Sequence, residues 1–266
     1  MSTEAPMGLS EYITHHLGNL TVQVGPGGFW TLQVDTLAVS LIFAVIISLW
    51  LWSFARRASS GVPSRGQAFV ELVVEFVDGQ VKDVFHGDSR LLGPLALTVF
   101  LWVLFMNLMD VLPIDAIPRA LSLFGVEHFR AVPTAEITTT FAMSLTIFVL
   151  TIFYSFRAKG FGGYMKEVFT EPFGPWLAPL NLLMNLIEMV SKPVSLAMRL
   201  FGNMYAGELV FMLLAGMIGA GSAVLFGLGV VGYLAWGIFE LLIILIQAFI
   251  FMVLSVVYIA MAQQHH

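Results

Sequence analysis

The sequence predicts an all-α integral membrane protein with about five membrane helices, one interfacial amphipathic helix and two unusually long helices near its C-terminal end. The chain has 266 residues, of which 58% are hydrophobic and only 11% are charged, with a mean hydropathy of +0.89. A soluble domain carries about 25% charged residues, so this composition excludes an ordinary soluble protein. Apolar runs such as 36–54 and 95–112 reach the roughly 20 residues that a helix needs to cross the hydrocarbon core.

We expect the chain, 1–266, to form a single membrane domain, and its first third contains one spanning and one interfacial helix. An N-terminal segment, 1–34, precedes a first span at 35–55. The helix predicted at 67–86 carries charges at spacings of four, three and four, which form one polar stripe: Glu71, Glu75, Asp78 and Lys82. Because four charges argue against spanning, we expect this helix to lie in the membrane interface.

Two further spans are predicted within 94–156, followed by a loop rich in Gly and Pro. The last part, 180–262, is predicted to form two helices of about 40 residues joined by the Gly-rich stretch 218–222. At ~1.5 Å per residue each helix would be ~60 Å long, about twice the ~30 Å hydrocarbon core. Each helix therefore either breaks into two spans at its glycines or lies steeply tilted as one arm of a hairpin.

The distribution of Lys and Arg predicts the orientation of the chain. With five spans, two basic residues, Arg119 and Arg130, fall on the side that also holds 1–34. Eight fall on the opposite side: Arg56, Arg57, Arg65, Lys82, Arg90, Arg157, Lys159 and Lys166. The N-terminus is therefore expected outside and the C-terminus in the cytoplasm. The first thirty residues lack a basic stretch followed by an apolar one, so no cleavable signal peptide is expected.

Charged and polar residues recur along the first long helix. They are spaced by four, three, four and four: Glu188, Lys192, Ser195, Arg199 and Asn203. A charge at the centre of a membrane helix costs about 2.5–3.5 kcal/mol on insertion, so it suggests a function. Arg199 has no acidic residue three or four positions away, whereas Glu188 and Lys192 have a favourable ion-pair spacing. For Arg199 the alternatives are a structural ion pair with an acid on another helix, or a side chain that extends to the membrane interface. For Glu188 the alternative is a structural pair with Lys192.

Further polar residues lie where the two long helices would face each other. If these helices form an antiparallel hairpin, Glu208 and Glu240 come to a similar depth, and Gln247 lies near the level of Arg199 or beyond. Asn107 and Asp110 end the second span, where Asp110 could equally sit at the headgroup level. Glu136 begins the third span and is more simply explained by the helix dipole.

Two C-terminal motifs identify the chain as similar to a known family. The run from Ser191 to Leu209, SKPVSLAMRLFGNMYAGEL, and the run from Gln247 to Leu254, QAFIFMVL, resemble the signatures of the a subunit of bacterial F-type ATP synthases. Residues 12–20, with a His-His pair, and 107–113 fit the same family. The resemblance covers the whole chain and favours the tilted hairpin over the broken helices.

The resemblance implies a non-catalytic subunit that forms the stator proton channel of the rotary enzyme. Arg199 matches the essential arginine that faces the carboxylates of the c-subunit ring and separates two offset half-channels. The outer half-channel is expected to use Asn203, Glu208, Glu240, Gln247, Asn107, Asp110 and Asp115. The cytoplasmic half-channel is expected to use Glu188 and Asn185. Two departures from relatives are Glu240, where some carry His, and Asn185, where some carry an acid.

The implied partners are the c-subunit ring, the peripheral-stalk b subunits, the remaining ATP synthase subunits and the lipid bilayer of a bacterial inner membrane. Neither nucleic acid, nor a cofactor, nor a metal is expected, because the sequence has no cysteine, no phosphate-binding loop and no metal-ligand spacing. The competing interpretations are a secondary transporter, which would need internal repeats, and a membrane scaffold, which would need no charge at Arg199. The coupling ion could be H⁺ or Na⁺, because the ring subunit binds most of it.

Overall fold

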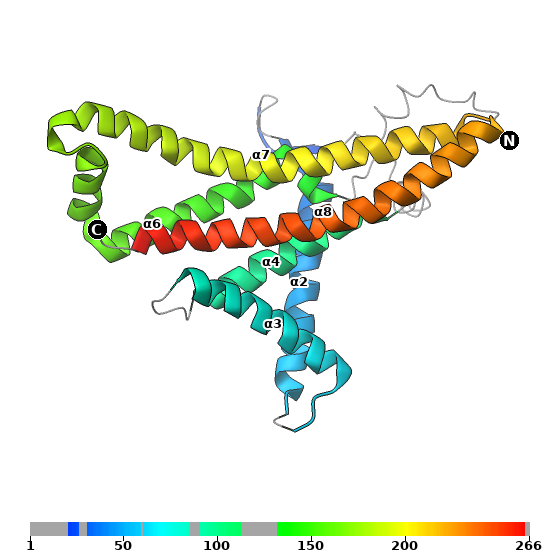
Figure 1. Cartoon of the computed structure of the whole chain (residues 1–266), viewed down its shortest axis with the longest axis horizontal. Helices are drawn as coiled ribbons and strands as arrows, with labels where there is room; N and C mark the ends of the chain where they lie inside the picture. Colours follow the sequence, from blue (N-terminus) through cyan, green and yellow to red (C-terminus); the bar gives the residue numbers. More distant parts are fainter. Residues whose placement is uncertain (1–20, 27–30, 60, 86–90, 113–131, 264–266) are drawn as a thin grey trace. The chain divides into compact units, whose positions relative to one another are not determined.

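The structure, a computed structural model, describes residues 21–26, 31–59, 61–85, 91–112 and 132–263. Two short strands, β1 (Thr21–Gln23) and β2 (Thr31–Gln33), precede a series of helices (Figure 1). The helices are α2 (Val34–Arg57), α3 (Arg65–Val84), α4 (Leu92–Leu108), α6 (Ile137–Thr170), α7 (Ala178–Gly219) and α8 (Ala223–Gln263). All of them except α3 are long and apolar enough to cross a membrane, which confirms the predicted all-α membrane fold.

The chain divides into two compact units, each containing parts of the same long helices. Unit 1 comprises the described parts of Met1–Leu49 and Trp102–Thr139, together with Phe201–Gln247. Unit 2 comprises the described parts of Trp50–Leu101, Thr140–Leu200 and Ala248–His266.

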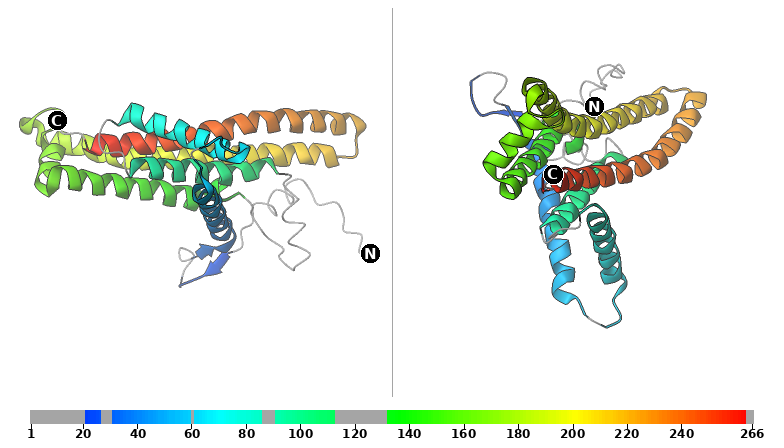
Figure 2. Two further views of the ribbon diagram at one scale, coloured as in Figure 1. Left: turned by 90° about the horizontal axis from the view of Figure 1, so that it is seen from below. Right: turned by 60° about the vertical axis from the view of Figure 1, so that its left-hand side comes forward.

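In unit 1 a small antiparallel ladder, which the sequence analysis did not anticipate, leads directly into α2. Thr21 pairs with Gln33 in this ladder, and Figure 2 shows both strands just before α2. The Gln33 side chain donates to Glu136 Oε1 at 2.9 Å and accepts from Thr138 Oγ1 at 2.6 Å. These bonds tie the ladder to the start of α6 and give Glu136 a structural contact.

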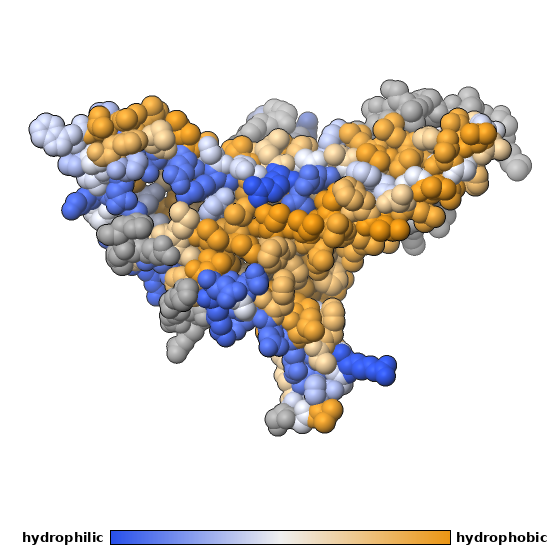
Figure 3. Space-filling view, viewed as in Figure 1, coloured by the Kyte–Doolittle hydropathy of each residue, from blue (hydrophilic) through white to orange (hydrophobic). Residues whose placement is uncertain are grey.

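The two longest helices are continuous, with 42 residues in α7 and 41 in α8. The chain turns between them at Gly221, whose φ of +73° favours glycine. Gly232 lets the helices approach closely, because a Cβ there would lie 2.8 Å from the Leu214 side chain. The broken-helix alternative is therefore wrong, and helices longer than the hydrocarbon core must tilt within it. Figure 3 shows hydrophobic side chains over much of this hairpin near its turn.

In unit 2 the region after the third span differs from the sequence prediction. Residues 157–170 were expected to form a loop, but α6 continues to Thr170 across a break at Gly160, where φ is 70° and ψ is 165°. Glycine adopts this backbone conformation readily, so the chain changes direction at this residue and is helical again directly after it. We call the segment beyond the break, 161–170, the hook.

Helix α3 confirms the predicted amphipathic helix to within two residues at each end. It begins after Ser64, whose Oγ accepts from the Gln67 backbone N–H at 3.3 Å and so caps the helix. Val77 and Val81 are buried, whereas Glu71 and Glu75 are exposed. Its position in the membrane interface stays a prediction.

Candidate functional site

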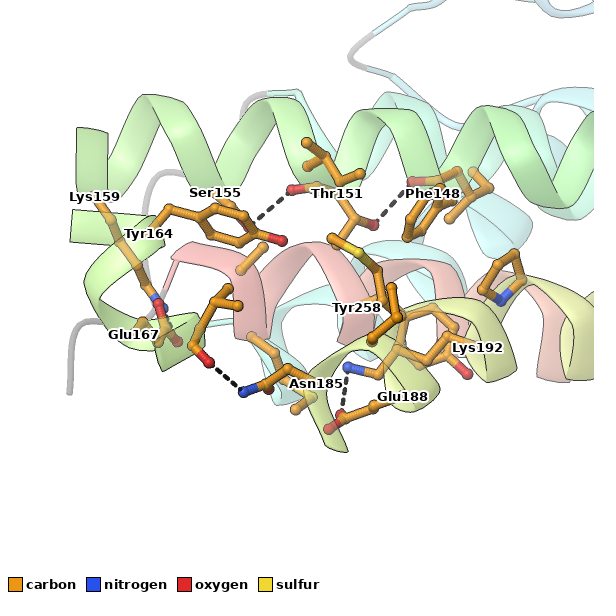
Figure 4. A pocket seen from close by; sticks show the side chains of 18 of the residues that line it. Phe148, Thr151, Ser155, Lys159, Tyr164, Glu167, Asn185, Glu188, Lys192 and Tyr258 are labelled. Carbon is orange, nitrogen blue, oxygen red and sulfur yellow. Dashed lines mark hydrogen bonds and ion pairs between the residues drawn. The ribbon is translucent and has the colours of Figure 1, made fainter. Parts of the chain in front are cut away.

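Unit 2 contains a cavity of about 340 Å³ bounded by α6, α7 and α8, which we call the polar cavity (Figure 4). Its walls are mostly apolar, with hydroxyl, amide and charged groups facing inward. The predicted residues Asn185 and Glu188 both line it. The structure thus brings together the two residues that the sequence analysis assigned to the cytoplasmic half-channel.

The wall of the cavity on α6 is a line of hydroxyl side chains spaced by seven and four residues, which share one helical face: Ser144, Thr151 and Ser155. Ser144 Oγ donates to the Pro193 carbonyl of α7 at 2.6 Å. Pro193 has no backbone N–H, so the Met189 carbonyl loses its usual partner one turn along α7. Met189 also lines the cavity, where water could satisfy this carbonyl.

Glu188 forms the predicted ion pair with Lys192, at 2.7 Å. The Glu188 side chain is 57% exposed and that of Lys192 is 32% exposed, so the pair is reachable by water. The Lys192 ammonium also lies 5.6 Å from the centre of the Tyr258 ring on α8. The carboxylate is therefore both paired with a cation and in contact with water.

Asn185 has a role that the sequence did not indicate. Its Nδ2 donates to the Val168 carbonyl at 3.0 Å and to the Glu171 carbonyl at 2.9 Å, so it ties the hook to α7. The amide nitrogen is therefore committed to holding the cavity wall.

The cavity contains a second ion pair, which the sequence analysis did not predict. Lys159 Nζ lies 2.6 and 2.7 Å from the two carboxylate oxygens of Glu167. The two residues are eight apart, with Gly160 between them, in a stretch predicted to be a loop. No local spacing rule connects residues across such a break, so only the fold reveals the pair.

Unit 1 holds a carboxylate cluster formed by Asp110 and Glu240 beside Gly207. Asp110 is 5% exposed and Glu240 is fully buried. A Cβ on Gly207 would lie 2.9 Å from Glu240 Oε1 and 3.0 Å from Asp110 Oδ2. The two carboxylate oxygens are therefore separated by at most twice this distance. Only glycine at this position of α7 leaves room for both.

Several other predicted residues are buried within unit 1. Glu208 is 4% exposed, Gln247 is 3% exposed and Asn107 is fully buried. Neither amide atom of Asn107 has a hydrogen-bond partner among the described residues. Burying an amide without a partner costs about 1–3 kcal/mol, so bound water is the expected partner. Asp115 lies outside the described residues.

The carboxylate that the structure places beside Glu240 belongs to Asp110, which the sequence analysis had treated as an entrance or headgroup residue. The sequence analysis placed Glu208 and Glu240 at a similar depth on facing helices, and this remains a prediction. Asp110 follows the end of α4 in a 3-10 turn, Met109–Val111, which sets its direction. That turn is hard to predict from a continuous apolar run.

Arg199 lies on an exposed face of α7, as does Asn203 one turn later. Leu196 and Leu200, which lie close to Arg199 along α7, are buried and mark the packed side of the helix. Because inner and outer positions alternate with the helical period, the guanidinium is directed away from the packed side of α7. The arginine is therefore presented to whatever covers this surface.

Comparison with known proteins identifies the family. The family model "ATP synthase A chain" matches residues 37–260. "ATP synthase subunit a" of Coxiella burnetii is 50% identical over 262 residues, covering 97% of each chain. "ATP synthase subunit a" of Alkalilimnicola ehrlichii is 49% identical over 255 residues, covering 96% of each, and that of Pseudoalteromonas atlantica is 46% identical over 271 residues, covering 97% of each. The chain belongs to the ATP synthase subunit a family.

Proposed function

We propose that this chain is the stationary proton path of a rotary ATP synthase, with two half-channels that serve a ring of c subunits. Family membership and the separation of polar groups into two regions support the proposal. The single observation that carries it is the exposed position of Arg199 on a helix that is long and apolar enough to cross a membrane. A guanidinium keeps its charge at physiological pH, so a partner that covers this face with a carboxylate gains a favourable charge interaction.

The outer half-channel runs through unit 1 in this proposal. Asn107, Asp110 and Asp115 receive protons from outer water, and Glu208, Glu240, Asn203 and Gln247 carry them towards the ring. The Asp110–Glu240 contact supports this role, because two carboxylates a few ångströms apart cannot both ionise cheaply. Such a pair holds one proton between its members and can pass it on.

The polar cavity of unit 2 is the cytoplasmic half-channel. Glu188 is its main proton-exchanging group, because it faces the cavity and is more than half exposed. Asn185 also lines the cavity, but its amide group binds the hook and so supports the wall of the proton path. The bias of Lys and Arg places this region on the cytoplasmic side, with the N-terminus outside.

Arg199 couples the two half-channels to the ring. A ring carboxylate facing lipid must be neutral, because an isolated charge in hydrocarbon is very costly. Near Arg199 the ionised form is favoured, so the carboxylate releases its proton there and takes another from the opposite half-channel. The fixed charge also blocks direct proton leakage. The b subunits and the remaining subunits hold this chain still while the ring turns.

Replacing the arginine tests this function. Arg199→Ala should abolish ATP-driven acidification of inverted membrane vesicles while the complex still assembles, and Arg199→Lys should fail as well, because an ammonium lacks the planar guanidinium fork. Arg57→Ala, at the exposed end of α2, is the control and should pump normally. Near-normal pumping by either Arg199 variant contradicts the proposal.

A further inference from the structure

The Lys159–Glu167 ion pair is more withdrawn from solvent than the Lys82–Asp78 and Glu188–Lys192 pairs. The Lys159 side chain is only 9% exposed and that of Glu167 is 29% exposed. In the Lys82–Asp78 pair of α3 the corresponding values are 67% and 42%. A surface pair contributes little because water screens it, whereas a charge with 9% exposure strongly requires its counter-charge.

The hook keeps the Glu167 carboxylate in a defined place. Lys159 holds it from the main part of α6, across the break at Gly160. From the other side, Asn185 binds two carbonyls at the end of the hook. Asn181 Nδ2 adds bonds to the Phe169 carbonyl at 3.0 Å and the Gly174 carbonyl at 2.8 Å. The pair is thus part of a fixed wall of the polar cavity.

Charges on every wall of the polar cavity act on Glu188. Besides Glu188, the titratable groups that line it are Lys159, Tyr164 and Glu167 of α6, Glu171 just after α6, Lys192 of α7 and Tyr258 of α8. Charges that face one cavity act on one another across several ångströms, and the water that reaches the cavity weakens this interaction. With Glu167 in place the field of Lys159 is largely cancelled, whereas an uncompensated ammonium in this wall would repel a proton approaching Glu188.

We propose that Lys159 and Glu167 are positioning residues whose mutual neutralisation sets the proton affinity of Glu188 and so the cytoplasmic pH range of proton exchange. This inference rests on the proposed function of the polar cavity as the cytoplasmic half-channel. It assigns a role in proton transfer to two residues that need not carry the proton themselves.

The test measures the rate of ATP-driven proton uptake, as a function of external pH, by inverted vesicles that contain the whole complex. In these vesicles the external face is the cytoplasmic side of the membrane. Glu167→Gln leaves Lys159 uncompensated and should move the acid limb of the profile to lower pH, by about half a pH unit for charges facing one cavity. Lys159→Gln leaves an extra carboxylate and should move the limb to higher pH by a similar amount. The double neutral variant should return close to the wild-type profile. Lys82→Gln, which removes an exposed charge of α3, should leave the profile in place.

A purely structural pair would behave differently. Both single variants would then lower the rate without shifting the profile, or shift it in the same direction, and the double variant would not recover; any of these results overturns the inference. If Glu167→Gln does not assemble, Lys159→Gln still tests the sign of the shift, and the charge swap Lys159→Glu with Glu167→Lys, which keeps the pair neutral, should leave the profile close to that of the wild type. Glu188→Gln separates the two proposals. If it leaves pumping unchanged, the cavity is not the half-channel, whereas slower pumping without opposite shifts in the pair variants refutes only the role of the pair.

Discussion

In unit 1 the Glu240 carboxylate lies close to a second carboxylate, whereas in unit 2 the Glu188 and Glu167 carboxylates each lie against a lysine. Glu240 is also fully buried, while the Glu188 side chain is 57% exposed. The two regions therefore offer a proton different surroundings, namely a buried pair of carboxylates in unit 1 and lysine-paired carboxylates in unit 2. Under the proposed function, the two half-channels would present these different surroundings to a proton on its way to and from the ring.

The largest effect is expected from removing both acids of the carboxylate cluster. Asp110→Asn and Glu240→Gln should each lower ATP-driven pumping roughly tenfold, because one titratable group remains, and the double variant should lose well over ~100-fold, more than the product of the two single losses. Glu75→Gln, on the exposed stripe of α3, is the matched control and should pump normally. Equal losses in the single and double variants would support a chain of separate steps and contradict a shared proton.

A smaller but more specific effect is expected from Gly207→Ala. Alanine normally stabilises a helix by about 1 kcal/mol relative to glycine. At this position the added methyl group would lie within 3.0 Å of both carboxylates and push them apart. Pumping should therefore fall several-fold, although assembly is preserved.

Gly79→Ala provides the control for this substitution, because nothing lies within 4 Å of the Cβ that it would add to α3. It should leave pumping unchanged. If Gly207→Ala pumps as well as Gly79→Ala, the contact between Asp110 and Glu240 is not needed for proton transfer.

Much of this account could be predicted from the sequence, because apolar runs and intramembrane charges follow simple rules. The five spans, the amphipathic helix and the Glu188–Lys192 pair all rest on local periodicity. The contacts that the sequence missed join distant segments. Asp110 approaches Glu240 only because α4 ends in a short turn and Gly207 has no side chain. Lys159 reaches Glu167 only because the chain remains helical after Gly160.

The smallest effect on proton flux is expected from Asn185→Ala. The change removes two hydrogen bonds to the hook, each worth about 1 kcal/mol, so thermal stability of the purified complex should fall. Pumping below the unfolding temperature should change by less than about twofold, because the amide nitrogen serves the wall and not the proton. A large loss of pumping at unchanged stability would show instead that Asn185 belongs to the path.

The central claim is that the carboxylate cluster exchanges protons with the outer side and the polar cavity with the cytoplasmic side. The most direct measurement is the pumping rate of vesicles in which the pH on each side is varied separately. Glu240→Gln should alter the response to pH on the outer side only, and Glu188→Gln should alter the response to pH on the cytoplasmic side only. If either variant changes the response to both sides equally, or to the opposite side, the assignment of the two regions to two half-channels is wrong.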